Sequence, residues 1–280
     1  MSGVNPLAKH FRQPAIYLAL PSKGQYWPEG SIDLPLTGQI PVYPMTTRDE
    51  IVLRTPDALL NGEGVVSTIQ SCCPSIKNAW FMPNNDSDAI LIAIRIASYG
   101  PDMDVDSKCP NCNSDNQHTI DLNYTIDRVN FPNFDNIIKC NNLKIKLKPQ
   151  TYEVANKANL AAFEEQKMLI NLITESSNDE SKVLEFNKRL ASLNELNIDL
   201  LTGTTDYIET NDGTRVTDPN FIAEFYENAD SKIIRSIKKA VETIKAESNL
   251  PKIGVTCSAC ENAYEVGIEF DYARFFDQDS

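Results

Sequence analysis

Two Cys-x-x-Cys pairs constrain the fold of this chain more than any other feature. Cys109 and Cys112 form the first pair, and Cys257 and Cys260 form the second. Two such turns can direct four thiolates at one tetrahedral ion, and each pair precedes a segment that alternates polar and apolar residues, as in a zinc ribbon. Because residues 113 to 256 separate the pairs, a shared site requires distant segments to fold together.

The long separation is compatible with one metal ion. Closing a flexible loop of this length costs about 4 to 5 kcal/mol plus a constant, whereas zinc binding to small structural sites contributes about 10 to 16 kcal/mol. A folded insertion whose ends lie close together lowers the closing cost further. We therefore predict one structural Zn²⁺ per chain, bound by Cys109, Cys112, Cys257 and Cys260. Four thiolates leave no open position for a catalytic water.

Other roles for these cysteines are less well supported. Four unrelated cysteines are the simplest alternative, and a redox Cys-x-x-Cys is the second, although it gives no reason for a second pair that also precedes a strand. His118 could replace one ligand, but it lies inside an alternating segment, residues 118–124. Cys72, Cys73 and Cys140 are predicted to be small buried hydrophobic residues.

Charge and hydropathy exclude several classes of protein. With 26 basic and 39 acidic residues the net charge is −13, which repels nucleic acid. The basic segment 232–239 has apolar residues at helical spacing, so we interpret it as a solvated helix face. No segment is apolar enough to span a bilayer, and residues 1–12 lack the apolar core of a secretory signal, so we expect synthesis in a cytoplasm.

No group of residues predicts catalysis. The chain has two histidines, His10 and His118, which leaves few candidates for acid–base or nucleophilic chemistry. The acidic pairs at 164–165 and 179–180 fall on predicted helices and are expected to be solvated. Lys23 lies in a turn-like segment without the phosphate-loop pattern. We predict no catalytic residue, no cofactor other than zinc, and no enzyme activity.

Local signals predict the elements before the first cysteine pair. Residues 15–20 form a short apolar run that ends in a proline- and glycine-containing turn, which is typical of a strand. Thr47 and Glu50 have the spacing of a capping box. Further helices are expected over 56–61 and 65–73, and a mostly buried helix over 88–99.

Strands and helices are also predicted in the remainder of the chain. Residues 118–124, 142–147 and 263–270 alternate as half-buried strands, and Asn211-Asp-Gly213 marks a hairpin. Helices are expected over 152–174, after a capping box of Ser177 and Glu180, from Pro219, and through 244. The result is an α+β fold in three parts. They are an N-terminal mixed domain (1–100), a discontinuous zinc ribbon (101–149 plus 251–280), and an inserted helical region with a small hairpin (150–250).

Four N-terminal segments resemble a known family. They are residues 20–26 (LPSKGQY), 42–50 (VYPMTTRDE), 55–62 (TPDALLNG) and 93–100 (AIRIASYG). Together they are similar to the baseplate hub proteins of T-even-like contractile-tailed bacteriophages. The similarity covers roughly residues 14 to 125, and beyond them only the hairpin near 212–213 and the last cysteine pair.

The resemblance implies a non-enzymatic protein of the baseplate hub. Its partners would be other phage baseplate and tail hub proteins, without nucleic acid or membrane, and its location the virion tail or, during assembly, the host cytoplasm. A permanent virion component, a transient assembly factor and a homo-oligomer all remain open. The alternative is a zinc-ribbon adaptor in transcription or nucleic-acid metabolism, against which the net charge of −13 argues.

Overall fold

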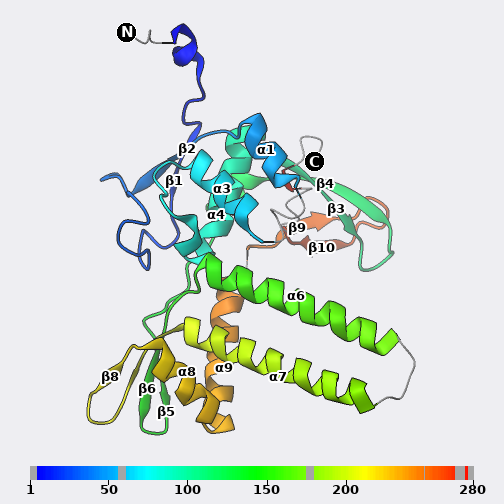
Figure 1. Cartoon of the computed structure of the whole chain (residues 1–280). Helices are drawn as coiled ribbons and strands as arrows, with labels where there is room; N and C mark the ends of the chain where they lie inside the picture. The colour runs from blue at the N-terminus through cyan, green and yellow to red at the C-terminus, as the bar shows by residue number, and fades with distance from the viewer. Residues whose placement is uncertain (1–4, 56–60, 175–179, 249, 269–274, 277–280) are drawn as a thin grey trace. The chain divides into compact units, whose positions relative to one another are not determined.

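The computed structural model divides the chain into two compact units, residues 1–130 with 249–280, and residues 131–248 (Figure 1). It contains helices and several small antiparallel sheets, which confirms the predicted α+β class. Among the described helices, none has the length and apolar character needed to cross a membrane. The residues described are 5–55, 61–174, 180–248, 250–268 and 275–276.

The first unit is built around helix α4 (Asn84–Tyr99). Each residue from 89 to 94, in the middle of the helix, is at most 1% exposed, so every face of the helix packs against neighbouring residues there. The alternation of isoleucines in this segment therefore reflects a helix buried on every side rather than a strand, as predicted. Strands β1 (Ile16–Ala19) and β2 (Gln39–Val42) pair antiparallel and contact it. The other elements before α4 in the described part of the chain are η1 (Pro6–His10), α1 (Thr47–Leu53), α3 (Glu63–Cys72) and η2 (Ala79–Phe81).

The N-terminus of α1 differs by one residue from the predicted capping box. Thr46, not Thr47, is the N-cap, and its side chain accepts the backbone N–H of Asp49. Asp49 in turn accepts the Thr46 N–H at 2.8 Å. The shift leaves Glu50 free to accept the hydroxyl of Tyr99 at 3.0 Å, and it buries Asp49. A helix predicted over residues 56–61 falls largely outside the described residues.

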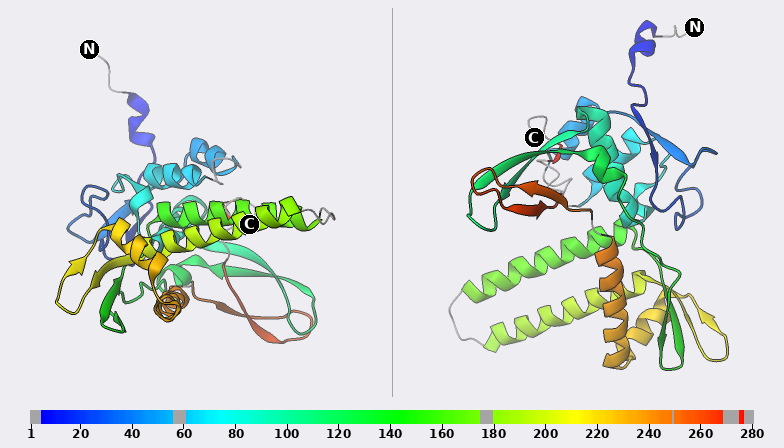
Figure 2. Two further views of the ribbon diagram at one scale, coloured as in Figure 1. Left: turned by 60° about the horizontal axis from the view of Figure 1, so that its bottom comes forward. Right: turned by 180° about the vertical axis from the view of Figure 1, so that it is seen from behind.

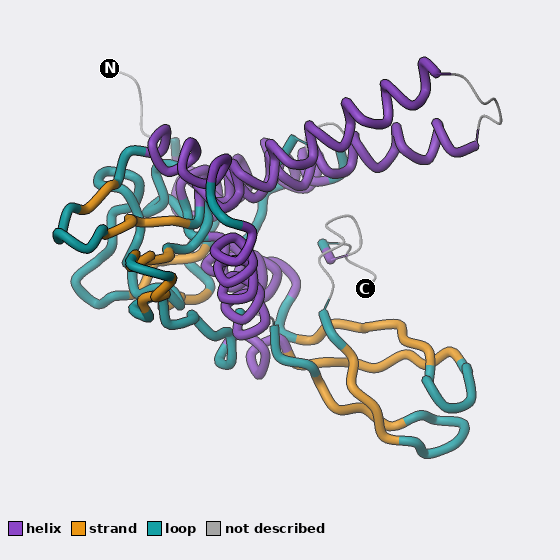
Figure 3. The backbone as a smooth tube through the Cα atoms, turned by 90° about the horizontal axis from the view of Figure 1, so that it is seen from below, coloured by secondary structure: helices purple, strands orange, loops and turns teal. Residues whose placement is uncertain are grey.

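Two hairpins complete the first unit. Strands β3 (Asp102–Lys108) and β4 (Asp115–Asp121) pair along their whole length, and β9 (Ile253–Thr256) pairs with β10 (Ala263–Val266). The hairpins lie side by side in Figures 2 and 3. The strand predicted over 118–124 ends early, because the Asp121 side chain accepts the N–H of Asn123 and starts helix α5 (Leu122–Ile126).

The second unit holds a four-stranded antiparallel sheet in the order β5-β6-β7-β8. Its strands are β5 (Ile137–Cys140), β6 (Leu143–Leu147), β7 (Thr205–Glu209) and β8 (Arg215–Val216). The predicted hairpin between β7 and β8 is present, with Gly213 at φ +84°, a conformation that favours glycine. Strands β5 and β6 pair here, although they lie in the range 101–149 predicted for the zinc ribbon.

Helices of the second unit agree with the predicted segments. A hairpin of two long helices, α6 (Tyr152–Thr174) and α7 (Glu180–Gly203), connects the adjacent strands β6 and β7. The predicted cap residue Ser177 lies outside the described residues. Helices α8 (Pro219–Asn228) and α9 (Ser231–Glu247) begin at Asp218 and Asp230, whose side chains accept backbone N–H groups of the first turn.

Candidate metal centre

The two Cys-x-x-Cys turns adopt the same backbone conformation. In the first, the Cys109 N–H donates to Ser114 O at 3.0 Å and the Asn113 N–H donates to Cys109 O at 2.9 Å. In the second, the Cys257 N–H donates to Asn262 O at 2.9 Å and the Glu261 N–H donates to Cys257 O at 3.0 Å.

The residue that follows each pair is left-handed. Asn113 has φ 58° and Glu261 has φ 56°. This turn returns the chain into the next strand while both cysteine side chains of a pair point the same way. The two pairs therefore form matching knuckles, one at the tip of β3–β4 and one at the tip of β9–β10.

The knuckles bring all four sulfur atoms together. Every Sγ lies within 4.8 Å of the others. Between the knuckles, Cys109 and Cys260 are 3.7 Å apart and Cys112 and Cys257 are 3.6 Å apart. A tetrahedral ion about 2.3 Å from each sulfur requires sulfur–sulfur edges of about 3.8 Å. The thiols are thus spaced to hold a metal ion, and among the described residues no other group of metal-ligating side chains converges in this way.

Polar side chains around the sulfurs link one knuckle to the other. Asn116, which is 7% exposed, accepts the N–H and the hydroxyl of Ser258 at 2.9 and 2.8 Å. Its amide nitrogen donates to Ser114 O at 3.0 Å and approaches the Cys257 sulfur at 3.6 Å. The sequence does not mark Asn116 as part of the site, because an asparagine in an alternating strand carries no distinctive signal.

The thiols experience different electrostatic environments. The hydroxyl of Ser114 lies 3.2 Å from the Cys257 sulfur and 3.0 Å from that of Cys112. Its hydrogen bond is the main reason that the pKa of Cys257 falls to about 5, and it also lowers the pKa of Cys112. Hydrogen bonds to the sulfur stabilise the thiolate, which is the form that binds metal.

His118, the alternative ligand, is engaged elsewhere. Its Nε2 is 3.1 Å from the hydroxyl of Tyr264, on the other hairpin. The same hydroxyl lies 2.7 Å from Oγ of Ser107. These contacts join the strands of the two hairpins away from the cysteines. His118 therefore supports the arrangement of the knuckles but does not contact the sulfur atoms.

The other residues considered from sequence have ordinary structural roles. Cys72 and Cys73 are fully buried and Cys140 is 9% exposed, which confirms them as buried residues; burial raises the pKa of Cys72 to about 12. His10 is exposed. Glu165 pairs with Arg189 of α7 at 3.4 Å.

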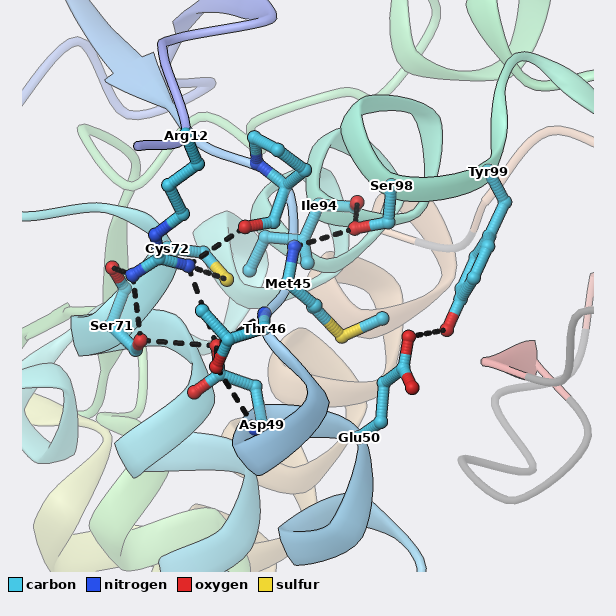
Figure 4. Close-up of polar contacts among 11 residues, drawn as sticks. Arg12, Met45, Thr46, Asp49, Glu50, Ser71, Cys72, Ile94, Ser98 and Tyr99 are labelled. Atoms are coloured by element: carbon cyan, nitrogen blue, oxygen red, sulfur yellow. Dashed lines mark hydrogen bonds and ion pairs between the residues drawn. The ribbon is translucent and has the colours of Figure 1, made fainter. Parts of the chain in front are cut away.

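Two of the segments that carry the family resemblance, 42–50 and 93–100, are hydrogen-bonded to each other in the first unit (Figure 4). Asp49 accepts the Ser71 hydroxyl at 3.1 Å and lies 3.4 Å from Arg12. Arg12 also donates to the carbonyls of Pro44 and Ser71, each at 2.7 Å. The Met45 N–H donates to Ser98 Oγ at 2.9 Å. Residues 42–50 therefore hold α1, α3 and α4 together.

A second polar cluster fixes the segment 20–26. The carboxylate of Asp86, which is fully buried, accepts the N–H and hydroxyl of Ser22 at 2.9 and 2.5 Å and the indole N–H of Trp27 at 2.8 Å. Burial raises the pKa of Asp86, and these three hydrogen bonds oppose that rise. Lys23 and Gly24 have positive φ angles, so residues 21–24 form the predicted turn.

Comparison with protein families identifies the chain's relatives. A family model described as T4 bacteriophage base plate protein matches residues 20–277. The chain belongs to this family. The match includes all four metal-centre cysteines and the bonded N-terminal segments, and it confirms the resemblance inferred from those segments. Comparison with curated proteins and with solved structures finds no match.

Membership in a baseplate family supports a structural component of the phage tail, with other baseplate proteins as its partners. It favours this role over that of a transcription adaptor. It also agrees with the expected lack of enzymatic activity, since a structural protein needs no catalytic site.

Proposed function

We propose that this protein is a non-enzymatic component of the baseplate hub of a contractile-tailed phage, and that a structural Zn²⁺ stabilises it. The observation that carries the proposal is the family match over residues 20–277. Its hub position is suggested by the segments 20–26, 42–50 and 93–100, which resemble hub proteins; 42–50 and 93–100 are hydrogen-bonded to each other, and 20–26 is bonded to Asp86 of α4.

Zinc is the metal best suited to the four sulfurs. Thiolates select soft ions, and four of them at tetrahedral spacing are typical of structural zinc. Cys109 and Cys112 precede the second unit in the chain, and Cys257 and Cys260 follow it. A bound ion therefore ties together the two chain segments from which the first unit is made.

Metal analysis tests the zinc site. Protein purified without added metal should contain about one zinc per chain, and Cys112→Ser should reduce that content strongly. Cys140→Ser is the matched control, because Cys140 lies in the second unit, in β5. Wild-type protein that is folded but contains no zinc would contradict the site.

Localisation tests the hub assignment. Mass spectrometry of purified virions and of baseplate assembly intermediates isolated from infected cells should detect the chain in one or both. Detection in virions identifies a permanent component, whereas detection only in assembly intermediates identifies an assembly factor. Absence from both preparations would contradict the hub assignment without affecting the zinc site.

A further inference from the structure

Helix α9 presents a basic face that the rest of the second unit does not use. Its apolar side packs inward, with Ile233 and Ile237 buried. The exposed basic residues occupy the opposite side of the helix at spacings of three and four residues, with Glu242 among them. They are Lys232, Arg235, Lys238, Lys239 and Lys245.

Within the second unit, these basic side chains make no ion pair or side-chain hydrogen bond to any other described residue. By contrast, Lys144 and Arg215 of the same unit are both paired with Glu209, at 2.7 and 2.8 Å. A group of uncompensated positive charges stands out in a chain whose net charge is −13. It is suited to an acidic partner surface.

Hairpin β3–β4 presents a face of the opposite sign. Its register places Asp102 opposite Asp121, Asp104 opposite Thr119, and Lys108 opposite Asp115. Because side chains alternate along a strand, Asp106 shares this face, while Met103 and Ile120 point to the other side and are buried. Lys108 is the one basic residue among the five aspartates of this face.

The two faces match in length as well as in charge. From Lys232 to Lys245 the helix rises about 20 Å, and β3 from Asp102 to Lys108 also spans about 20 Å. An open cavity of about 590 Å³ lies at the knuckle end of the hairpin. It is lined by Asp106, Ser107, Lys108, Asp115, Asn116 and Gln117.

We propose that the basic face of α9 in one copy of this chain docks on the acidic face of β3–β4 in a second copy. The two faces are different surfaces of the same chain, so the contact is head-to-tail and generates a ring or an open filament according to the rotation between copies. A polyanion is disfavoured as the occupant, because the remaining acidic surface repels it.

Charge reversal in solution tests the contact. We would measure self-association by sedimentation at low and physiological salt for the wild type and two variants, Arg235→Glu/Lys239→Glu and Asp102→Lys/Asp106→Lys. All four residues are exposed, so folding should persist, and circular dichroism would verify it. Each variant should weaken association at least about tenfold, and salt should weaken that of the wild type.

A matched control distinguishes the effect of reversing these faces from the effect of changing the net charge. Glu224→Lys/Glu227→Lys on α8 changes the net charge as much as the hairpin variant does, at exposed positions outside both faces. It should leave association unchanged. An equimolar mixture of the two reversal variants should restore association, because each reversed face then meets its complement on the other variant.

Several results would overturn the proposal. A wild type that stays monomeric at all concentrations would do so, as would reversal variants that associate normally or a mixture that fails to recover. A gel shift with duplex DNA at low salt tests whether nucleic acid binds to the basic face instead. DNA binding by a monomeric wild type, lost in the α9 variant, would assign the basic face to nucleic acid instead.

Discussion

Asn116 should control how tightly the metal centre holds its ion. It contacts both knuckles, through Ser258 on one side and Ser114 on the other, and its amide nitrogen lies 3.6 Å from the Cys257 sulfur. Asn116→Ala removes all of these contacts at once. Loss of such outer contacts typically costs about 10 to 100-fold in metal affinity, or about 1.4 to 2.7 kcal/mol.

The isosteric change Asn116→Asp distinguishes the hydrogen bonds that Asn116 accepts from those that it donates. An aspartate can still accept from Ser258, but it cannot donate to Ser114 or to the sulfur, and it adds a negative charge beside four thiolates. We therefore expect the zinc affinity of the Asn116→Asp variant to fall at least as far as that of the Asn116→Ala variant. The assay is competition with a chromophoric chelator at constant pH, which reports the zinc dissociation constant directly.

Gln117→Ala is the matched control. Gln117 is the next residue of β4 and is exposed on the opposite face, so its loss should leave zinc affinity within about twofold of the wild type. Release of zinc by Asn116→Ala at the same chelator concentration as by the wild type would refute this role for Asn116. Equal weakening by Gln117→Ala would also refute it, since the effect would then not come from the knuckle contacts.

Two further predictions concern the first unit. Asp86→Ala leaves the donors of Ser22 and Trp27 without their acceptor, so the free energy of unfolding measured with urea should fall by about 3 to 5 kcal/mol. Asp86→Asn keeps one acceptor oxygen and should destabilise the protein less. If Asp86→Ala destabilises the protein no more than a substitution at an exposed position, the stabilising role of this cluster is contradicted. Burial raises the pKa of Asp88 to about 6, so its contribution to stability is present at low pH and is lost as the pH rises through about 6. Asp88→Asn should remove this dependence and stabilise the protein by about 3 kcal/mol at pH 7. Unfolding curves whose pH dependence is unchanged would contradict this prediction.

The metal-centre cysteines could be predicted from sequence because their chemistry is carried by residue type and spacing. Cys-x-x-Cys turns need few outside contacts to form, and each is completed by its own backbone hydrogen bonds, such as that of Asn113 to Cys109. Helix α4 was predictable for a similar reason, since its length and flanking residues distinguish a buried helix from a strand.

Contacts between distant segments could not be predicted from sequence. Thr46 with Asp49 has the same capping-box spacing as Thr47 with Glu50, so the local pattern does not choose between them. Asp49 also contacts Arg12 and Ser71, which belong to other parts of the chain. The role of Asn116 depends on Ser258 in the same way. The pairing of β6 with β7 spans the whole α6–α7 hairpin, and local patterns contain no information about which strands meet.

The position of the second unit between the two knuckles has a consequence for synthesis. Residues 131–248 are synthesised before Cys257 and Cys260 exist. At about 5 to 20 residues per second, the first knuckle waits about 7 to 30 s for its partner. The earlier part of the second unit therefore has time to begin folding while Cys109 and Cys112 lack the other two ligands. A chain cut short anywhere in that interval cannot close the metal centre, so metal capture reports that translation has passed the second unit.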